Sequence, residues 1–148
     1  MNNPPLRILL ADDDEADRLI FTEAFSELKI KTTVETVNDG VQLMECLNME
    51  DVTLPHLLFL DLNMPRKNGL ECLKEIRSNV KLKDVSIAIY STSDHKKDVE
   101  ETLQGGANVY ITKPADFNIL KQVLEKAVMV TYQYQDKGMN PENFLLKI

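Results

Sequence analysis

Five short, strand-like runs recur along this sequence, and a segment with helical character follows each of them. Most of the runs are almost wholly apolar, as strands buried on both faces of a parallel sheet are. They extend over Leu6 to Ala11, Lys31 to Val37, Leu57 to Leu60, Val85 to Tyr90 and Val109 to Ile111. This alternation predicts an α/β domain in which right-handed crossovers place helices on both faces of a parallel sheet.

The expected helices lie between these runs and after the last one. The carboxylates of Asp12 to Asp14 suit the N-terminus of the first helix electrostatically. That helix carries an apolar set at helical spacing: Leu19, Ile20, Ala24, Phe25 and Leu28. The remaining helices are predicted over Val41 to Met49, Leu70 to Ser78, Lys96 to Gln104 and about Asp116 to Tyr132.

The length and charge of the chain narrow the class of protein. A chain of 148 residues fits one domain. Its 24 acidic and 17 basic residues give a net charge of −7, which argues against nucleic acid or an anionic membrane as the main partner. Cys46 and Cys72 are too few for a disulfide framework and are expected to be packed, reduced thiols. No apolar stretch approaches the ~18 residues of a spanning helix, so we expect a soluble, cytoplasmic, single domain.

Polar side chains leave the carboxyl ends of four predicted strands. Asp12 and Asp13 follow the first strand, Asp61 the third, Ser91 the fourth and Lys113 the fifth. Because ligands of open α/β sheets bind at the carboxyl ends of the strands, these side chains are expected to converge on one site. Any one of them alone would pass for a helix cap, a turn residue or a surface lysine, but their coincidence at strand ends favours a site.

The residue types indicate what such a site would bind. Clustered carboxylates repel one another, so they must share a proton or a cation. Carboxylate oxygens suit a hard ion such as Mg²⁺, which keeps several waters and is often shared with a phosphate. A phosphoryl group between Mg²⁺ and Lys113, with Ser91 donating a hydrogen bond, would satisfy every member of the cluster.

These positions and their neighbours resemble the receiver domain of two-component response regulators, from Leu6 to about Tyr132. The resembling segments are Ile8 to Asp14, Leu60 to Pro65, Asn68-Gly69 before a helix, Tyr90 to Ser93 and Gly106 to Pro114. The stretch from Asp61 to Gly69 most resembles stand-alone receivers related to those paired with bacterial phytochromes. The resemblance implies one receiver domain over residues 1–148, with a core over about 6–132 and a tail over 133–148. Its fold would be flavodoxin-like (βα)5, a doubly wound five-stranded sheet in the order 2-1-3-4-5.

The resemblance also implies roles for the polar residues at the site. Asp61 would be the phosphoacceptor, and Lys113 would pair with the phosphoryl oxygens. Asp13 would bind Mg²⁺ (or Mn²⁺) directly and Asp12 mainly through a water. Asp61 would also be a metal ligand, and the backbone carbonyl of Asn63 would be the third protein ligand.

Further positions of the resemblance concern switching and rate. Ser91 would be the switch hydroxyl, and Tyr110 the aromatic residue that turns inward when Ser91 moves. Asn63 and Ser93 occupy positions that tune self-dephosphorylation in the family. In related structures the Lys-Pro bond at this place is commonly cis, so Lys113-Pro114 is a candidate cis peptide bond.

The expected function is that of a single-domain response regulator, a phosphoacceptor signalling protein rather than an enzyme beyond slow self-dephosphorylation. Asp61 would take its phosphoryl group from a sensor histidine kinase or a histidine phosphotransfer protein. The surface of the fourth helix, fifth strand and fifth helix would then switch and contact an unknown downstream protein. The fifth helix carries a wide apolar stripe, which indicates either cover by the tail or a homodimer through that surface.

Two other classes of protein are alternatives. A haloacid-dehalogenase-type hydrolase also forms an aspartyl phosphate, but it needs a second Asp two residues after the nucleophile, where this chain has Asn63. A flavodoxin-like flavin binder would have a Ser/Thr/Gly-rich phosphate loop after the first strand, where this chain has carboxylates. In the tail, Asn140-Pro141-Glu142 followed by Phe144-Leu145-Leu146 indicates either a short docking helix or a frayed end.

Overall fold

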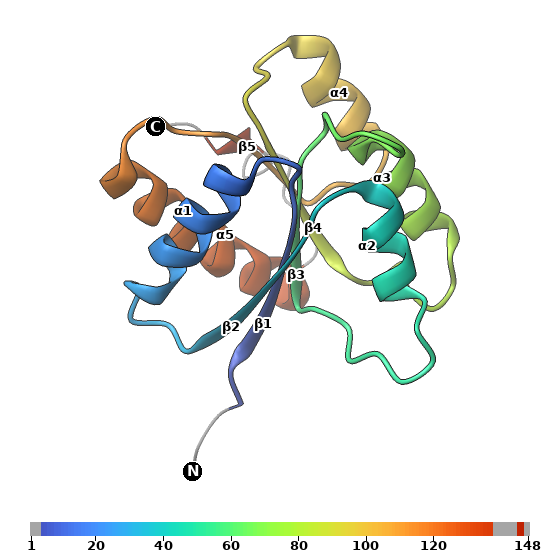
Figure 1. Ribbon diagram of the computed structural model, residues 1–148, viewed down its shortest axis with the longest axis horizontal. Helices are drawn as coiled ribbons and strands as arrows, with labels where there is room; N and C mark the ends of the chain where they lie inside the picture. The colour runs from blue at the N-terminus through green and yellow to red at the C-terminus, as the bar shows by residue number, and fades with distance from the viewer. Residues whose placement is uncertain (1–3, 138–144, 147–148) are drawn as a thin grey trace.

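The computed structural model describes residues 4–137 and 145–146, and its centre is a parallel sheet (Figure 1). The strands run in the order β2-β1-β3-β4-β5-β6, so the predicted order 2-1-3-4-5 is confirmed. Their bounds are β1 Leu6–Ala11, β2 Thr32–Val37, β3 Leu57–Leu60, β4 Ser86–Ser91, β5 Val109–Thr112 and β6 Leu145–Leu146. The four predicted strands that carry site residues at their ends are each confirmed to within one residue.

The short strand β6 extends this sheet beyond the five predicted strands. It pairs in parallel with β5, with Tyr110 opposite Leu145 and Ile111 opposite Leu146. The docking helix considered for this part of the tail is therefore wrong at Leu145 and Leu146, and its proposed start at Asn140-Pro141-Glu142 lies outside the described residues. A strand is favoured here because β5 would otherwise present an edge of unpaired backbone groups.

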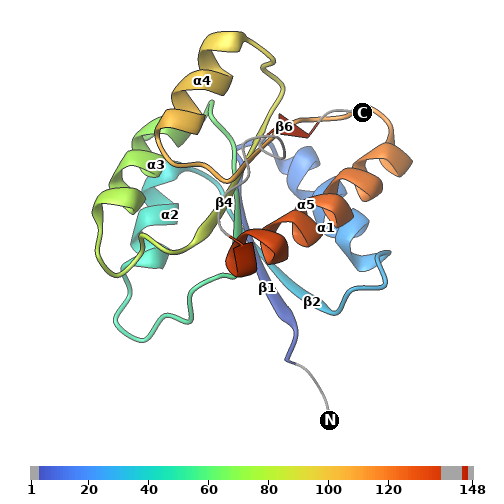
Figure 2. The ribbon, with the colours of Figure 1, turned by 180° about the vertical axis from the view of Figure 1, so that it is seen from behind.

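Within residues 4–137, five helices cover the two faces of the sheet. They are α1 Glu15–Ser26, α2 Gly40–Leu47, α3 Gly69–Ser78, α4 Lys96–Gln104 and α5 Phe117–Lys137. Helices α1 and α5 lie on one face, and α2, α3 and α4 lie on the other, as the front and back views show (Figures 1 and 2). Within the described residues, no helix is long and apolar enough to cross a membrane.

The helix boundaries follow local capping. The Asp14 side chain caps α1 by accepting a hydrogen bond from the Asp17 backbone N–H at 3.0 Å, and Asn68 and Glu71 form a capping box at α3. Gly69 is required where α3 begins, because a Cβ atom there would collide with the Asp61 carbonyl oxygen. The start of α3 is thereby packed directly against the backbone of a candidate site residue.

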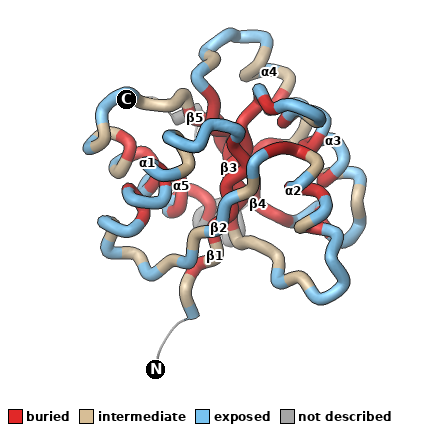
Figure 3. Tube along the Cα trace, viewed as in Figure 1, coloured by how far each residue is buried: buried red, intermediate tan, exposed pale blue. Residues whose placement is uncertain are grey.

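The buried hydrophobic residues form two clusters, one on each face of the sheet. Strands β1, β3, β4 and β5 are buried between them (Figure 3). On α1 the inward residues are Phe21, Ala24 and Phe25. Leu19 and Ile20, which share the spacing of that stripe, instead point outward and are 65% and 44% exposed. Periodicity alone left the rotation of this helix uncertain by one residue, and the larger Phe21 ring occupies the inward position.

The two cysteines differ in how deeply their side chains are buried. Cys72 of α3 is fully buried, as predicted, whereas Cys46 of α2 is only half-buried. Burial raises the pKa of the Cys72 thiol to about 11, so this group is a neutral packing residue at physiological pH.

Candidate functional site

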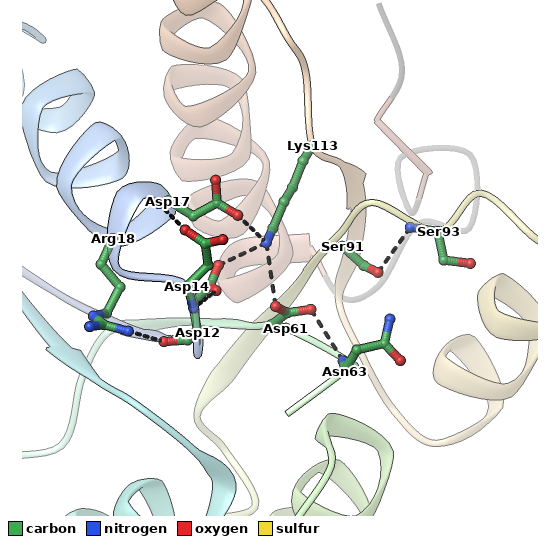
Figure 4. A network of polar contacts seen from close by, with 9 residues as sticks. All are labelled: Asp12, Asp14, Asp17, Arg18, Asp61, Asn63, Ser91, Ser93 and Lys113. Atoms are coloured by element: carbon green, nitrogen blue, oxygen red, sulfur yellow. Dashed lines mark hydrogen bonds and ion pairs between the residues drawn. The ribbon is translucent and has the colours of Figure 1, made fainter. Parts of the chain in front are cut away.

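The strand ends bring the predicted polar residues to one edge of the sheet (Figure 4). The backbone N–H of Asp12 bonds to the Val37 carbonyl at 3.1 Å, and that of Asp61 bonds to the Ala11 carbonyl at 3.0 Å. The N–H of Lys113 bonds to the Ser91 carbonyl at 2.8 Å. Each residue is thus held by a ladder bond to the neighbouring strand, which fixes where its side chain starts.

The Lys113 ammonium is the centre of the site. Its Nζ lies 2.8 Å from Asp12 Oδ2, 2.8 Å from Asp17 Oδ2 and 3.3 Å from Asp61 Oδ2. The Lys113 side chain is 10% exposed, and Nζ also lies 5.2 Å from the centre of the Tyr90 ring. An ammonium group has three protons, so three carboxylate acceptors use all of its donors.

The remaining carboxylate oxygens are held by backbone groups. The Asp14 N–H donates to Asp12 Oδ1 at 2.9 Å, and the Asn63 N–H donates to Asp61 Oδ1 at 3.2 Å. The Arg18 guanidinium donates to the Asp12 carbonyl at 2.8 Å. Asp12 and Asp61 therefore each have one carboxylate oxygen bonded to a backbone N–H and the other to Lys113.

Three carboxylates form a candidate cation site beside the lysine. Asp12, Asp13 and Asp61 each place one oxygen so that all three lie within 4.8 Å of one another. Mg²⁺ binds oxygens at about 2.0–2.1 Å, so opposite ligands of one ion stand about 4 Å apart. The donor type and spacing therefore fit a divalent ion after small side-chain adjustments. Asp13 is exposed, whereas Asp12 and Asp61 are buried, so an ion would be approached from the side of Asp13.

The electrostatics of the site reflect burial and crowding. Burial raises the pKa of Asp61 to about 6, with the nearby Asp12 carboxylate acting in the same direction and Lys113 opposing it. Burial alone would lower the pKa of Lys113, but hydrogen bonds to Asp12 and Asp17 and the charge of Asp61 raise it well above its ordinary value. The lysine is consequently a permanent cation facing a carboxyl group that is costly to keep ionised.

Ser91, Ser93 and Tyr110 form a second set of contacts beside the carboxylates. Ser91 is fully buried, and its hydroxyl oxygen accepts a hydrogen bond from the Ser93 N–H at 3.1 Å. Tyr110 is also fully buried, and its hydroxyl donates to the Ser93 carbonyl at 2.7 Å. The Ser93 hydroxyl donates to Asp98 of α4 at 2.5 Å. The segment after β4 is thus tied to β5 and to α4.

The structure corrects one expectation at the site. The described residues contain no cis peptide bond, so Lys113-Pro114 is trans rather than cis. Trans is the intrinsically preferred form of an X-Pro bond, and Lys113 reaches all three carboxylates from it.

Asp17 is a site residue that the sequence interpretation missed. It lies in the first turn of α1, and its carboxylate bonds to Lys113 at the same distance as Asp12 does. A signal was present in the sequence, because Asp17 stands three residues after the helix cap Asp14 and so on the turn nearest the strand ends.

Comparisons with known proteins agree with this arrangement. The family profile described as "Response regulator receiver domain" matches residues 8–125. Response regulator Rcp1 of Synechocystis is 32% identical over 128 residues, which are 84% of this chain and 87% of Rcp1. Chemotaxis protein CheY1 of Helicobacter pylori (strain ATCC 700392 / 26695) is 33% identical over 120 residues, covering 81% of this chain and 94% of CheY1.

Solved structures show the same similarity in three dimensions. The crystal structure of the phosphorylated cyanobacterial phytochrome response regulator RcpA has a TM-score of 0.75 at 32% identity and covers 89% of this chain and 93% of its own. The crystal structure of the Mn²⁺-bound form of Rcp1 has a TM-score of 0.73 at 30% identity. The match covers 88% of this chain and 93% of the Rcp1 chain. The former protein is described as phosphorylated and the latter as holding a divalent metal.

Proposed function

This chain belongs to the response regulator receiver family, and from that premise we propose that it is a single-domain response regulator whose phosphoacceptor is Asp61. The phosphoryl donor would be the phosphohistidine of a histidine kinase or of a histidine phosphotransfer protein. The observation that carries the proposal is the meeting of Lys113 with the buried Asp61 and Asp12 carboxylates at one edge of the sheet.

The proposed reaction is an in-line displacement at phosphorus. An Asp61 carboxylate oxygen attacks, the P–N bond to the donor histidine breaks, and the histidine keeps the electron pair as the acyl phosphate forms. Lys113 donates a hydrogen bond to a phosphoryl oxygen and neutralises the charge that collects there. Each of these roles requires positioning and charge, which the strand ends supply without covalent help from another side chain.

Asp12, Asp13, Asp61 and the backbone carbonyl of Asn63 are the groups that would hold a divalent ion. The similar protein Rcp1 has been solved in a Mn²⁺-bound form. When bound, Mg²⁺ would offset the repulsion between the phosphoryl oxygens and the carboxylates. The fit of the three carboxylate oxygens within 4.8 Å supports this assignment.

The output step is proposed to run through Ser91 and Tyr110. A phosphoryl oxygen on Asp61 would attract the Ser91 hydroxyl, which would move the segment after β4 and alter the pocket that holds Tyr110. The bond from the Tyr110 hydroxyl to the Ser93 carbonyl supports this coupling, because it ties the aromatic ring to the same segment. The signal would leave through the α4, β5 and α5 surface to a downstream protein or a second copy. Such a change is a shift between two populations whose size depends on differential contacts.

A hydrolase role is disfavoured by the residue at position 63. A second catalytic carboxylate would be needed there, and Asn63 offers an amide side chain and a backbone N–H that donates to Asp61. The proposed protein therefore stores the phosphoryl group as a signal, with Asn63 and Ser93 tuning its lifetime.

The proposal is tested by phosphorylating the chain directly. Wild type, Asp61→Asn and Asp13→Asn are incubated with phosphoramidate and Mg²⁺, and the modified residue is located by borohydride reduction and peptide mass spectrometry. We expect one Mg²⁺-dependent acyl phosphate on Asp61 of the wild type, none on Asp61→Asn and strongly reduced labelling of Asp13→Asn. Labelling at another residue, or labelling that persists in Asp61→Asn, would overturn the assignment.

A further inference from the structure

We propose that Asp17 is an internal counter-ion of Lys113 that competes with the incoming phosphoryl group and so sets the affinity of the site for it. The proposal rests on the proposed function, because it concerns regulation of the same site. Asp17 belongs to α1 rather than to a strand end, and it is not one of the three carboxylates that fit a shared cation.

The donor count of Lys113 makes competition unavoidable. Its three N–H donors are directed at Asp12, Asp17 and Asp61 in the resting chain. A phosphoryl oxygen that binds Lys113 must take one of these donors, so at least one carboxylate has to release the ammonium.

Asp17 is the carboxylate that is released at least cost. Its side chain is 35% exposed, whereas those of Asp12 and Asp61 are 0% and 8% exposed. A partly exposed carboxylate regains water when its partner leaves, but a buried one would be left without compensation. The contact of Lys113 with Asp61 is the longest of the three, at 3.3 Å, and passes to the phosphoryl group that Asp61 carries. Asp12 also accepts the Asp14 N–H, so Asp17 is the carboxylate that any further phosphoryl contact with Lys113 displaces.

The helix that carries Asp17 supports its release. Asp17 lies in the first turn of α1, where the backbone dipole favours a negative charge without a paired cation. Figure 4 shows the Asp17 carboxylate reaching toward the Lys113 ammonium from the helix, beside the carboxylates that come from the strand ends. The side chain can therefore leave Lys113 while its own charge stays stabilised.

The sign of the effect follows from charge. While Asp17 holds Lys113, it occupies a donor that the phosphoryl oxygens need, and its own negative charge repels them. Removing that charge while keeping the size of the side chain should strengthen binding of a phosphoryl group, and the effect should be distinct from a loss of fold.

The test is a titration of the full chain with beryllofluoride, a phosphoryl analogue, at saturating Mg²⁺ by isothermal calorimetry. The variants are wild type, Asp17→Asn and Glu23→Gln, the last of which makes the same charge change at an exposed position of the same helix. We expect Asp17→Asn to bind about threefold to tenfold more tightly and Glu23→Gln to stay within about twofold of wild type. Asp17→Glu, which restores the charge, should return the affinity toward that of wild type.

Equal or weaker binding by Asp17→Asn, when the wild type binds, would overturn the competition while leaving the proposed function intact. Absence of binding by the wild type would instead contradict the proposed function. A second measurement examines the counter-ion without any phosphoryl analogue: the rate of Lys113 acetylation by acetic anhydride, mapped by mass spectrometry. This rate should rise severalfold in Asp17→Asn and not in Glu23→Gln, and an unchanged rate would show that Asp17 does not hold the ammonium.

Discussion

The two faces of the sheet are packed with different kinds of side chain. On the face covered by α1 and α5, the rings of Phe21, Phe25, Phe59 and Tyr90 touch one another with centroids 4.9–6.3 Å apart. On the face covered by α2, α3 and α4, the described buried residues are aliphatic or sulfur-containing, and Tyr110 is the one aromatic residue among them. The same sheet thus has an aromatic face and an aliphatic face.

This difference separates the rings of the aromatic face, which their packing holds in place, from Tyr110, which we propose to move. Each ring of the aromatic face is held by edge-on contacts with others, so no ring can turn without disturbing its neighbours. Tyr110 lies among aliphatic side chains, and its hydroxyl bonds to the segment after β4. We therefore attribute the rigid support of the site to the aromatic face and place the switching that we propose on the aliphatic face.

The largest loss of stability is expected from a mutation that removes the ring at the centre of the aromatic face. Phe59 is fully buried and contacts three other rings, so Phe59→Ala should lower the free energy of unfolding by about 3–5 kcal/mol. The measurement is urea denaturation followed by circular dichroism. If Phe59→Ala proves too unstable to purify, Phe59→Leu should show a smaller loss in the same direction. A cost below about 1 kcal/mol for Phe59→Ala would contradict the rigid role of this face.

The next effect concerns the buried Asp61 carboxylate, which directly follows β3. The raised pKa of Asp61, about 6, means that the folded chain binds a proton there more tightly than the unfolded chain does. Without divalent metal, the contribution of Asp61 to stability should therefore fall as the pH rises from about 4 through about 6. Asp61→Asn should be more stable than the wild type by about 1–3 kcal/mol at pH 7.5, and the difference should vanish near pH 4.

That comparison is made by urea denaturation in the presence of a chelator. Asp51→Asn is the matched control, since Asp51 is exposed and lies in the segment between α2 and the amino end of β3. A difference between wild type and Asp61→Asn that is independent of pH would show that burial does not penalise the Asp61 charge.

A smaller effect distinguishes the two buried tyrosines. Tyr110→Phe removes the hydroxyl that donates to the Ser93 carbonyl and should cost about 0.5–1.5 kcal/mol of stability. Tyr90→Phe keeps the ring contacts of the aromatic face and should stay within about 0.5 kcal/mol of wild type. Thermal unfolding of both variants under one buffer condition provides the comparison, and equal costs would remove the distinction between the faces.

The smallest effect lies on the outer side of α1. Leu19→Gln should change the free energy of unfolding by less than about 0.5 kcal/mol, because Leu19 is 65% exposed. Phe21→Leu on the inner side of the same helix should be clearly destabilising. A large cost for Leu19→Gln would mean that this residue is covered in solution, which sedimentation at several concentrations would reveal.

Much of the site was predictable because strand ends are marked by abrupt changes in residue type. Asp61 follows four apolar residues and Lys113 follows a strand of β-branched and aromatic residues, so the chain itself shows where the sheet stops. The convergence of these residues then follows from parallel topology alone. Helix rotation is less well marked: Leu19 and Phe21 are both apolar, and only packing against Phe59 decides which faces inward. The same uncertainty hid Asp17, whose contact with Lys113 depends on the rotation of α1.

Features that depend on pairing between distant parts of the chain also could not be predicted from the sequence pattern. The pairing of Leu145 with Tyr110 depends on the exposed edge of β5, and nothing local in the apolar tail distinguishes a strand from a helix. The cis bond expected at Lys113-Pro114 came from the resemblance to related structures, whereas the observed trans bond is the intrinsic preference of an X-Pro bond.

The most direct test of the central claim is beryllofluoride binding by wild type and Asp61→Asn, measured with and without Mg²⁺. Tyrosine fluorescence reports the response of Tyr110, with Tyr110→Phe identifying its share of the signal. Our account predicts saturable, Mg²⁺-dependent binding by the wild type, a fluorescence change that Tyr110→Phe reduces, and no binding by Asp61→Asn. Binding by both proteins with equal affinity, or by neither, would contradict the assignment of Asp61 as the phosphoacceptor.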